Sequence, residues 1–276
     1  KDLLAKDYKK YSKQIVDLEK KISNENEKPN FTNEDLRKRQ YLSGLSIEDL
    51  ELILHPMAEE GKEASGSMGD DTPVAVLSSH FRPVSHYFRQ NFSQVTNPPI
   101  DSLRENKVMS LKTRFGNLGN ILNFDNLTKQ NIYVLNSPIL SNSQFEKFIN
   151  FFGNNSSIID CTFSEEETLF DSIKKIQKEA EIAVRQGVTQ LILSDKELSS
   201  FKLPIPMLLA VGSINSFLIE KKLRGYVSIN VQSGEALDTH SFATLIGVGA
   251  TTVNPYLAFD SLFQRHEKKL FGQFSF

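Results

Sequence analysis

The feature that most constrains the fold is a regular alternation of short apolar runs and helical segments from residue 131 onward. The apolar runs are Ile132–Leu135, Ile158–Phe163, Val188–Leu193, Tyr226–Val231 and Thr251–Val253. Segments with helical periodicity lie between and after them: Ser143–Phe152, Glu165–Gln186, Pro206–Leu223, Thr239–Ile246 and Leu257–Leu270. This alternation is typical of parallel strands joined by right-handed helical crossovers. It predicts an α/β core over about residues 131–270.

A (β/α) barrel and a doubly wound sheet both fit that alternation. No dinucleotide fingerprint follows the first strand, which favours a barrel-like or partial (β/α) barrel. Gly247-Val-Gly249 begins like such a fingerprint, but the third glycine is missing and the motif precedes a strand. Gly187 and Gly225 stand where C-terminal helix caps are expected.

The first 55 residues predict a helical arm. Its first part carries an apolar stripe at alternating spacings of four and three, made by Leu4, Tyr8, Tyr11, Ile15, Leu18 and Ile22. A polar linker, Ser23–Asn30, follows. Thr32 or Asn33 can cap a helix that runs through Gln40. Ser46, followed by Asp49, can open a second helix that ends at Leu54.

A loop-rich segment is predicted over about residues 56–130. Periodicity stops from Pro56 to Pro73, and loops of this length inside a compact domain are usually functional. Arg82–Phe92 has a helical pattern in which the aromatic side chains are spaced like core anchors. Pro98-Pro99 excludes regular helix and central strand around it.

Composition excludes several classes of protein. The chain has 276 residues, and 32 Lys+Arg nearly balance 34 Asp+Glu, so its charge favours neither nucleic acid nor an anionic membrane. No apolar run approaches the ~20 residues of a membrane-spanning helix. The single cysteine, Cys161, excludes an internal disulfide framework and a cysteine-ligated iron–sulfur cluster, and is expected in the core. We expect a cytoplasmic setting.

The usual catalytic signatures are absent, and the sequence predicts no catalytic residue and no metal site. It contains neither a phosphate-binding P-loop nor a nucleophile elbow, and its five histidines lack the spacing of metal ligands. Asp70-Asp71 can hold a hard cation or bind backbone N–H groups in a turn, and we favour the second interpretation.

Two strand–loop units near the C-terminus leave other functions open. Ser233-Gly234-Glu235 and Asn254-Pro255-Tyr256 follow successive strands, as the phosphate-binding loops of some barrels do. Glu235 places a negative charge in the first loop, and Pro255 removes an N–H donor from the second. These two residues favour a barrel end without ligand, and an autonomous flavin- or phosphate-binding barrel enzyme is kept as the alternative function. An interaction module that docks through the N-terminal helix is a third.

The irregular loops carry a specific resemblance. Their sequences are His55-Pro56-Met57-Ala58, Gly66-Ser67-Met68-Gly69-Asp70-Asp71-Thr72-Pro73 and Gln94-Val95-Thr96-Asn97-Pro98-Pro99-Ile100-Asp101. Gln232-Ser233-Gly234-Glu235-Ala236 and Val253-Asn254-Pro255-Tyr256 continue the match in order. The chain resembles the central domain of the glutamate synthase large subunit over about residues 36–262. One departure is Asn215-Ser216, where members commonly carry histidines.

The resemblance implies that residues 1–276 are one domain of a longer polypeptide. The chain begins with Lys1 and ends in an apolar segment, which agrees with that interpretation. In such enzymes an amidotransferase domain hydrolyses glutamine, and ammonia travels inside the protein to 2-oxoglutarate at an FMN-binding domain. The resemblance implies a non-catalytic connecting role, with the isolated domain inactive and no cofactor of its own. FMN and an iron–sulfur cluster are expected on the absent neighbouring domain.

The resemblance also implies site residues and partners. Met68, Thr96 and Asn97 match positions that line the ammonia tunnel of the family. The surrounding loop-supporting residues are Ser67, Gly69, Asp70, Asp71, Pro98 and Asp101. The expected partners are the amidotransferase and FMN-binding domains of the same polypeptide, together with a small electron-donating subunit or ferredoxin. No nucleic acid and no membrane are expected as partners.

Overall fold

A computed structural model describes residues 15–23, 27–63, 76–79, 82–88, 100–101, 103–104, 108–116 and 131–271 of the chain. The centre of this part is a four-stranded parallel sheet in the order β4-β6-β8-β9. The strands are β4 (Ser156–Asp160), β6 (Gln190–Ser194), β8 (Ser228–Gln232) and β9 (Thr252–Asn254). Their spatial order follows their order in the chain.

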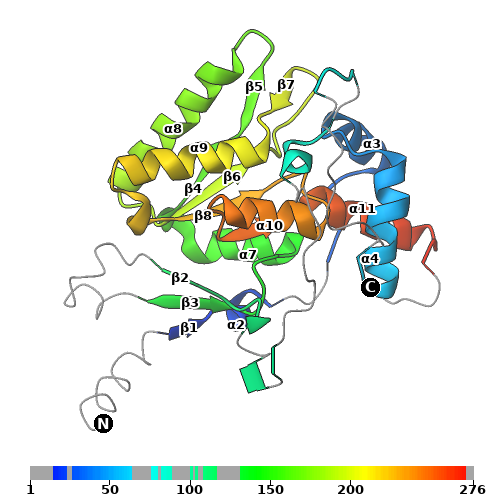
Figure 1. Ribbon diagram of the computed structural model, residues 1–276, viewed down its shortest axis with the longest axis horizontal. Coiled ribbons are helices and arrows are strands. Elements are labelled where there is room, and N and C mark those ends of the chain that lie inside the picture. Colours follow the sequence, from blue (N-terminus) through cyan, green and yellow to red (C-terminus); the bar gives the residue numbers. More distant parts are fainter. Residues whose placement is uncertain are drawn as a thin grey trace.

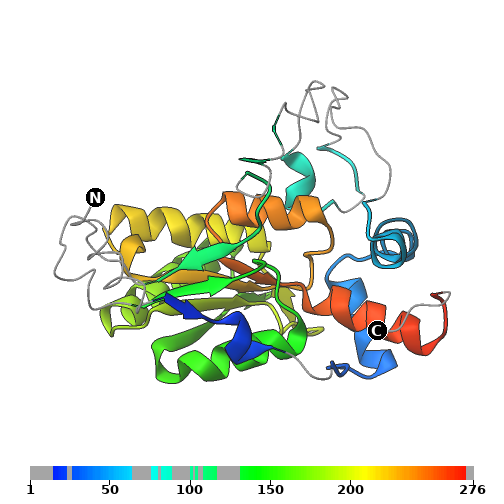
Figure 2. The ribbon, with the colours of Figure 1, turned by 90° about the horizontal axis from the view of Figure 1, so that it is seen from below.

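The crossover helices all cover the same face of this sheet (Figures 1 and 2). They are α8 (Leu169–Arg185), α9 (Met207–Glu220) and α10 (Thr239–Gly247). Right-handed crossovers that always step in one direction place every helix on one side, whereas a doubly wound sheet reverses direction. The arrangement therefore confirms the prediction of a partial (β/α) barrel, and no closed barrel forms among the described residues.

The two faces of the sheet are covered by different helices. Leu191, Leu193, Ile229, Val231 and Val253 form one apolar core with the crossover helices. The other face is covered by α7 (Asn142–Phe152), whose first turn is closed by a capping box on Ser141. Cys161 is fully buried in the first core, as predicted, and burial raises the pKa of its thiol.

A small second sheet packs against α7 and lies beside the main sheet (Figure 2). β1 (Ile15–Asp17) runs parallel to β3 (Ile132–Leu135), and β2 (Thr113–Phe115) runs antiparallel to it. α2 (Glu19–Ile22) follows β1. The prediction of one helix through Ile22 was wrong over 15–17, because a strand partner favours the β-branched pair Ile15-Val16. Residues 1–14 lie outside the described part.

The helical arm continues beyond its predicted end. α3 (Asn33–Leu42) is capped by Thr32, which accepts from the backbone N–H of Asp35 at 3.3 Å. A π-helix, η1 (Asp49–Leu54), then runs directly into α4 (His55–Glu60), which ends at Gly61 with φ of +63°. The predicted loop therefore began too early. Pro56 lies at the junction of η1 and α4, where the hydrogen-bonding pattern of the helix changes.

Several shorter elements also differ from expectation. In the described part of the helix predicted over 82–92, residues 82–88, the structure has a 3₁₀ turn, η2 (Val84–Tyr87), and Tyr87 and Phe88 are about half exposed. The apolar run at 158–163 is divided into β4 and β5 (Thr162–Ser164), and β5 pairs antiparallel with β7 (Lys202–Pro204). Residues 89–92 lie outside the described part.

Glycine caps were predicted at the C-terminal ends of two helices, and one of them is present. Gly187 has φ of +96° after α8, as predicted. After α9 the left-handed residue is Lys222, with φ of +59°, and Gly225 lies in the 3₁₀ helix η4 (Arg224–Tyr226). The cap predicted at Gly225 was therefore wrong. A further 3₁₀ helix, η3 (Gly153–Asn155), follows α7, and α11 (Tyr256–Glu267) is the last helix of the described chain.

Candidate functional site

The carboxyl ends of the parallel strands bring together side chains that carry the chemistry of this domain. Asp195 directly follows β6, Ser233-Gly234-Glu235 follows β8, and Tyr256 opens α11 two residues after β9. This is the edge at which parallel α/β sheets bind their ligands. We call the group Asp195, Ser233, Gly234, Glu235 and Tyr256 the carboxyl-edge cluster.

The carboxylate of Asp195 occupies the loop after β8. It accepts a hydrogen bond from the Ser233 hydroxyl at 2.9 Å. The backbone N–H of Gly234 donates to both of its oxygens, at 3.0 Å each. Burial raises the pKa of Asp195 to about 6, so the group is mainly ionised at pH 7. The loop that the sequence analysis left open as an anion-binding loop thus binds the carboxylate of Asp195, which belongs to the chain itself.

Gly234 lies in a space that admits no larger residue. A Cβ at this position would lie 2.7 Å from Ser43 Oγ, 2.8 Å from Leu257 Cδ1 and 3.0 Å from Tyr256 Oη. The hydroxyls of Ser43 and Tyr256 are buried and make no hydrogen bond within the described chain. The Tyr256 hydroxyl interacts electrostatically with Asp195, and burial keeps it protonated by raising its pKa. The Ser43 hydroxyl therefore remains without a hydrogen-bond partner among the described residues.

Glu235 has a different role in the same loop. Its carboxylate accepts from the backbone N–H of Met207 at 2.6 Å, at the start of α9, whose own N-cap residue is Pro206. A carboxylate at this position completes the helix terminus and interacts favourably with its dipole. Burial, reinforced by the charge of Asp195, raises the pKa of Glu235 to about 7. The negative charge that argued against a phosphate site is therefore used as a helix cap.

A chain of hydrogen-bonded polar side chains lies beneath the cluster on the α7 side of the sheet. Ser194 donates to Gln232 at 2.9 Å, and Gln232 donates to Asn254 at 3.2 Å. Asn254 donates to Asn142 of α7 at 2.9 Å, and Asn142 donates to Asp260 at 2.7 Å. Ser194, Asn142 and Asp260 were not singled out from the sequence, and the hydrogen bond between Gln232 and Asn254 was not predicted. The available signal was the recurrence of Gln, Asn and Ser inside apolar strands, where a polar side chain needs a buried partner.

The arm covers this edge of the sheet. Gln40 of α3 donates to Ser261 of α11 at 2.7 Å, and Leu36 packs against Tyr256 and Leu257. Arg39 donates to the carbonyl of Lys196, in the loop after β6, at 2.7 Å. The site of a ligand in a phosphate-binding barrel is here covered by a helix.

An ion-pair network fixes α4 to α11. Arg265, 8% exposed, donates to both carboxylate oxygens of Glu51 at 2.9 and 2.8 Å and also contacts Nδ1 of His55. Nε2 of His55 lies 2.9 Å from Glu59, and its ring stacks on Phe271 with centroids 4.8 Å apart. The network holds the helix that leads into residues 62–75.

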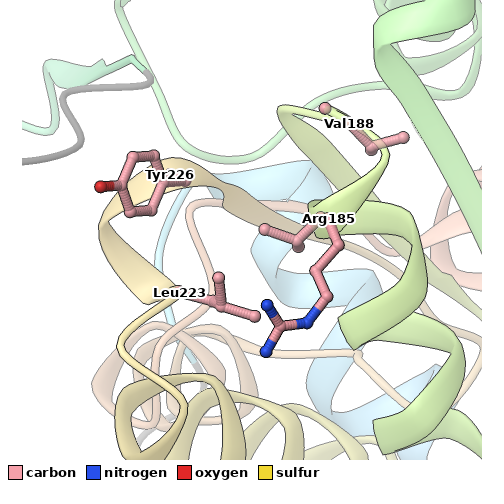
Figure 3. Close-up of a pocket in the computed structure, with 6 residues that line it drawn as sticks. Arg185, Val188, Leu223 and Tyr226 are labelled. Atoms are coloured by element: carbon pink, nitrogen blue, oxygen red, sulfur yellow. The ribbon is translucent and has the colours of Figure 1, made fainter.

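The described residues line a pocket near each end of the main sheet. An apolar pocket of about 170 Å³ separates α4 from α10 and α11, and its lining includes Met57, Leu237, Phe242 and Phe259. The other, of about 330 Å³, lies where β6 and β8 begin. Figure 3 shows Arg185 reaching toward Leu223 in this second pocket, while the Tyr226 hydroxyl points away. The guanidinium of Arg185 already pairs with Glu181 at 2.7 Å.

Of the predicted site residues, only Asp101 belongs to the described chain. It is exposed and stabilises its own turn, accepting from the backbone N–H groups of Leu103 and Arg104 at 3.1 and 3.0 Å. The other eight lie outside the described residues, and their roles stay predictions: Met68, Thr96, Asn97, Ser67, Gly69, Asp70, Asp71 and Pro98.

Two general features of the described residues bear on partners. No group of three or more His, Cys, Asp or Glu side chains among them is arranged to hold a metal ion. None of the helices in the described chain is both long enough and apolar enough to cross a bilayer.

The fold and its edge define a class: a partial (β/α) barrel domain whose ligand-binding edge is filled by its own side chains. A sequence profile of the glutamate synthase central domain matches residues 38–274, and the chain belongs to that family.

Named relatives agree with this assignment. The chain is 51% identical over 261 residues to the glutamate synthase [NADPH] large chain of Azospirillum brasilense, covering 94% of this chain and 17% of that protein. It is 46% identical to the Bacillus subtilis large chain, covering 82% of this chain and 15% of that protein. The spinach chloroplast ferredoxin-dependent glutamate synthase is 39% identical, and the match covers 83% of this chain and 14% of that protein. The chain therefore spans about a sixth of the length of these relatives.

Proposed function

We propose that this chain is the non-catalytic connecting domain of a glutamate synthase. In this proposal residues 1–276 form a single domain, with a helical arm to about residue 55, a loop-rich segment to 130 and the βα core to about 270. It joins a glutamine amidotransferase domain to an FMN-binding synthase domain. The observation that carries the proposal is the family match over residues 38–274 of a chain that spans only 17% of its Azospirillum relative.

The domain also lines part of the path that carries ammonia from glutamine to 2-oxoglutarate. Such a path must exclude bulk water, because ammonia that is protonated is no longer nucleophilic. The pocket beneath α4 supports this role, since its apolar lining suits a neutral molecule better than ammonium. α4 ends at Gly61, immediately before the segment that contains Met68. Thr96 and Asn97 belong to the second loop of the proposed path.

The proposal assigns cofactors and partners to the rest of the polypeptide. FMN and an iron–sulfur cluster belong to the neighbouring synthase domain, and glutamate formation at the flavin is an oxidoreductase reaction of nitrogen assimilation. Electrons come from a small subunit or from ferredoxin, since the named relatives include NADPH and ferredoxin-dependent enzymes. The enzyme works in the cytoplasm, without nucleic acid or membrane as a partner.

Thr96→Phe in the full-length enzyme tests the path. A bulky ring there should lower the glutamate formed per glutamine hydrolysed several-fold, and free ammonia should appear in the medium. Synthesis from added ammonium should be retained, because the synthase site is unchanged. Thr239→Phe, at an exposed position on α10, is the matched control and should leave the ratio unchanged. An unchanged ratio in Thr96→Phe would remove Thr96 from the path.

A further inference from the structure

The loop after β8 has the donor geometry of an anion-binding site. The Gly234 N–H and the Ser233 hydroxyl converge on one carboxylate, and the Glu235 N–H donates to Ser233 Oγ at 3.3 Å, which orients that hydroxyl. Converging backbone and hydroxyl donors of this kind stabilise an anion strongly when water is excluded. Asp195, 2% exposed, supplies the anion from the neighbouring strand.

The surroundings limit the size of the anion. Ser43 Oγ, Leu257 and Tyr256 Oη crowd the outer side of Gly234, so the loop has no room for a tetrahedral group there. The buried hydroxyl of Ser43 adds a donor on the same side. A planar carboxylate, held by both oxygens from the Gly234 N–H, fits the site.

We propose that residues 232–235 form a carboxylate-binding site that Asp195 occupies in place of a free ligand, and that binds a free carboxylate of formate size once the Asp195 side chain is removed. The carboxylate cross-links the loops after β6 and β8. The carboxyl edge is therefore ordered without any external ligand. This inference is independent of the proposed function, because it concerns contacts within the domain.

The test is chemical rescue in the full-length protein. Asp195→Ala removes a group the size of formate and leaves the donors of the loop in place. Hydrogen exchange in peptides covering residues 228–238 should become about tenfold faster, since a buried hydrogen-bonded charge is lost. Sodium formate should restore slow exchange in a saturable way, whereas sodium chloride at equal ionic strength should not.

Two control variants separate binding from general salt effects. Asp195→Asn keeps the space filled, so formate should not change its exchange. Asp160 ends the adjacent strand β4 and bonds Thr162 and Lys202 at a half-exposed position, so Asp160→Ala should show no rescue. Equal exchange of Asp195→Ala in formate and chloride would overturn the proposal, as would equal rescue by phosphate.

If Asp195→Ala does not fold alone, refolding from denaturant decides the question. A higher yield of folded protein in formate than in chloride supports the site. Equal yields in the two salts overturn it.

Discussion

At the scale of single residues, buried carboxyl groups organise the carboxyl edge. Asp195 holds the loop after β8, Glu235 completes the first turn of α9, and Asp260 accepts from Asn30 and Asn142. Burial raises the pKa values of Asp195 and Asp260 to about 6 and that of Glu235 to about 7. Each group therefore makes the stability of the folded domain depend on pH.

The sign of that dependence can be tested at Glu235. Its pKa is raised from an ordinary value of 4.5, so the folded state binds more protons than the unfolded state between about pH 4.5 and 7. The associated stability is present below pH 4.5 and is lost as pH rises through 7, by on the order of 2 kcal/mol. Glu235→Gln retains an acceptor for Met207 and should flatten this decline. Urea unfolding between pH 5 and 7.5 measures it.

Glu220→Gln provides the matched control for that experiment. Glu220 is exposed at the other end of α9, so its replacement should leave the pH dependence as in the wild type. Parallel pH profiles for the wild type and Glu235→Gln would show that Glu235 does not titrate with a raised pKa in the folded domain.

At the scale of elements, sequence patterns were reliable where a segment is stabilised by its own residues. Thr32 caps its helix with a local hydrogen bond, as predicted, and the apolar runs at β6 and β8 become fully buried strands. The prediction failed where contacts with a segment distant in the sequence determine the secondary structure. Ile15–Asp17 is a strand because β3 lies beside it, and no periodicity in the segment itself indicates that partner.

In the candidate site, too, local features could be recognised in the sequence, whereas contacts between distant residues could not. From the sequence, the loop at 233–235 was only an alternative anion-binding loop, a barrel end without ligand was favoured, and Asp195 was not anticipated as its partner. Asp195 lies 38 residues from Ser233, and only the pairing of β6 with β8 brings them together. The polar residues within the strands were a usable signal, because each must find a buried partner. Which partner it finds depends on register, which the sequence alone does not specify.

The α4–α11 contact yields a prediction at this scale. Arg265→Ala removes a bidentate ion pair and a contact to His55, and leaves Glu51 and His55 without their shared donor. We expect a loss of about 2 kcal/mol in the free energy of unfolding, because the guanidinium is nearly buried. Arg185→Ala, which breaks the exposed pair with Glu181, should change it by about 0.5 kcal/mol or less. Chemical denaturation of both variants measures these losses in the free energy of unfolding. Equal losses in Arg265→Ala and Arg185→Ala would contradict the prediction.

At the scale of the whole molecule, the domain combines the topology of a ligand-binding barrel with a closed ligand edge. The strands run in barrel order, the crossover helices share one face, and α3 covers the carboxyl ends of the strands (Figure 1). These features favour the connecting domain over an autonomous flavin enzyme, because the loop that would bind a phosphate already holds Asp195. The connecting domain and the autonomous flavin enzyme differ in whether the chain binds FMN.

A titration of the purified chain with FMN separates them. Binding at the carboxyl edge would require the loss of the Asp195–Gly234 hydrogen bonds, displacement of α3 and burial of a phosphate beside two carboxylates. Each of these changes is unfavourable, so flavin fluorescence should remain unquenched up to high micromolar protein. Stoichiometric quenching would instead mean that the edge opens to admit a ligand, and that the domain carries chemistry of its own.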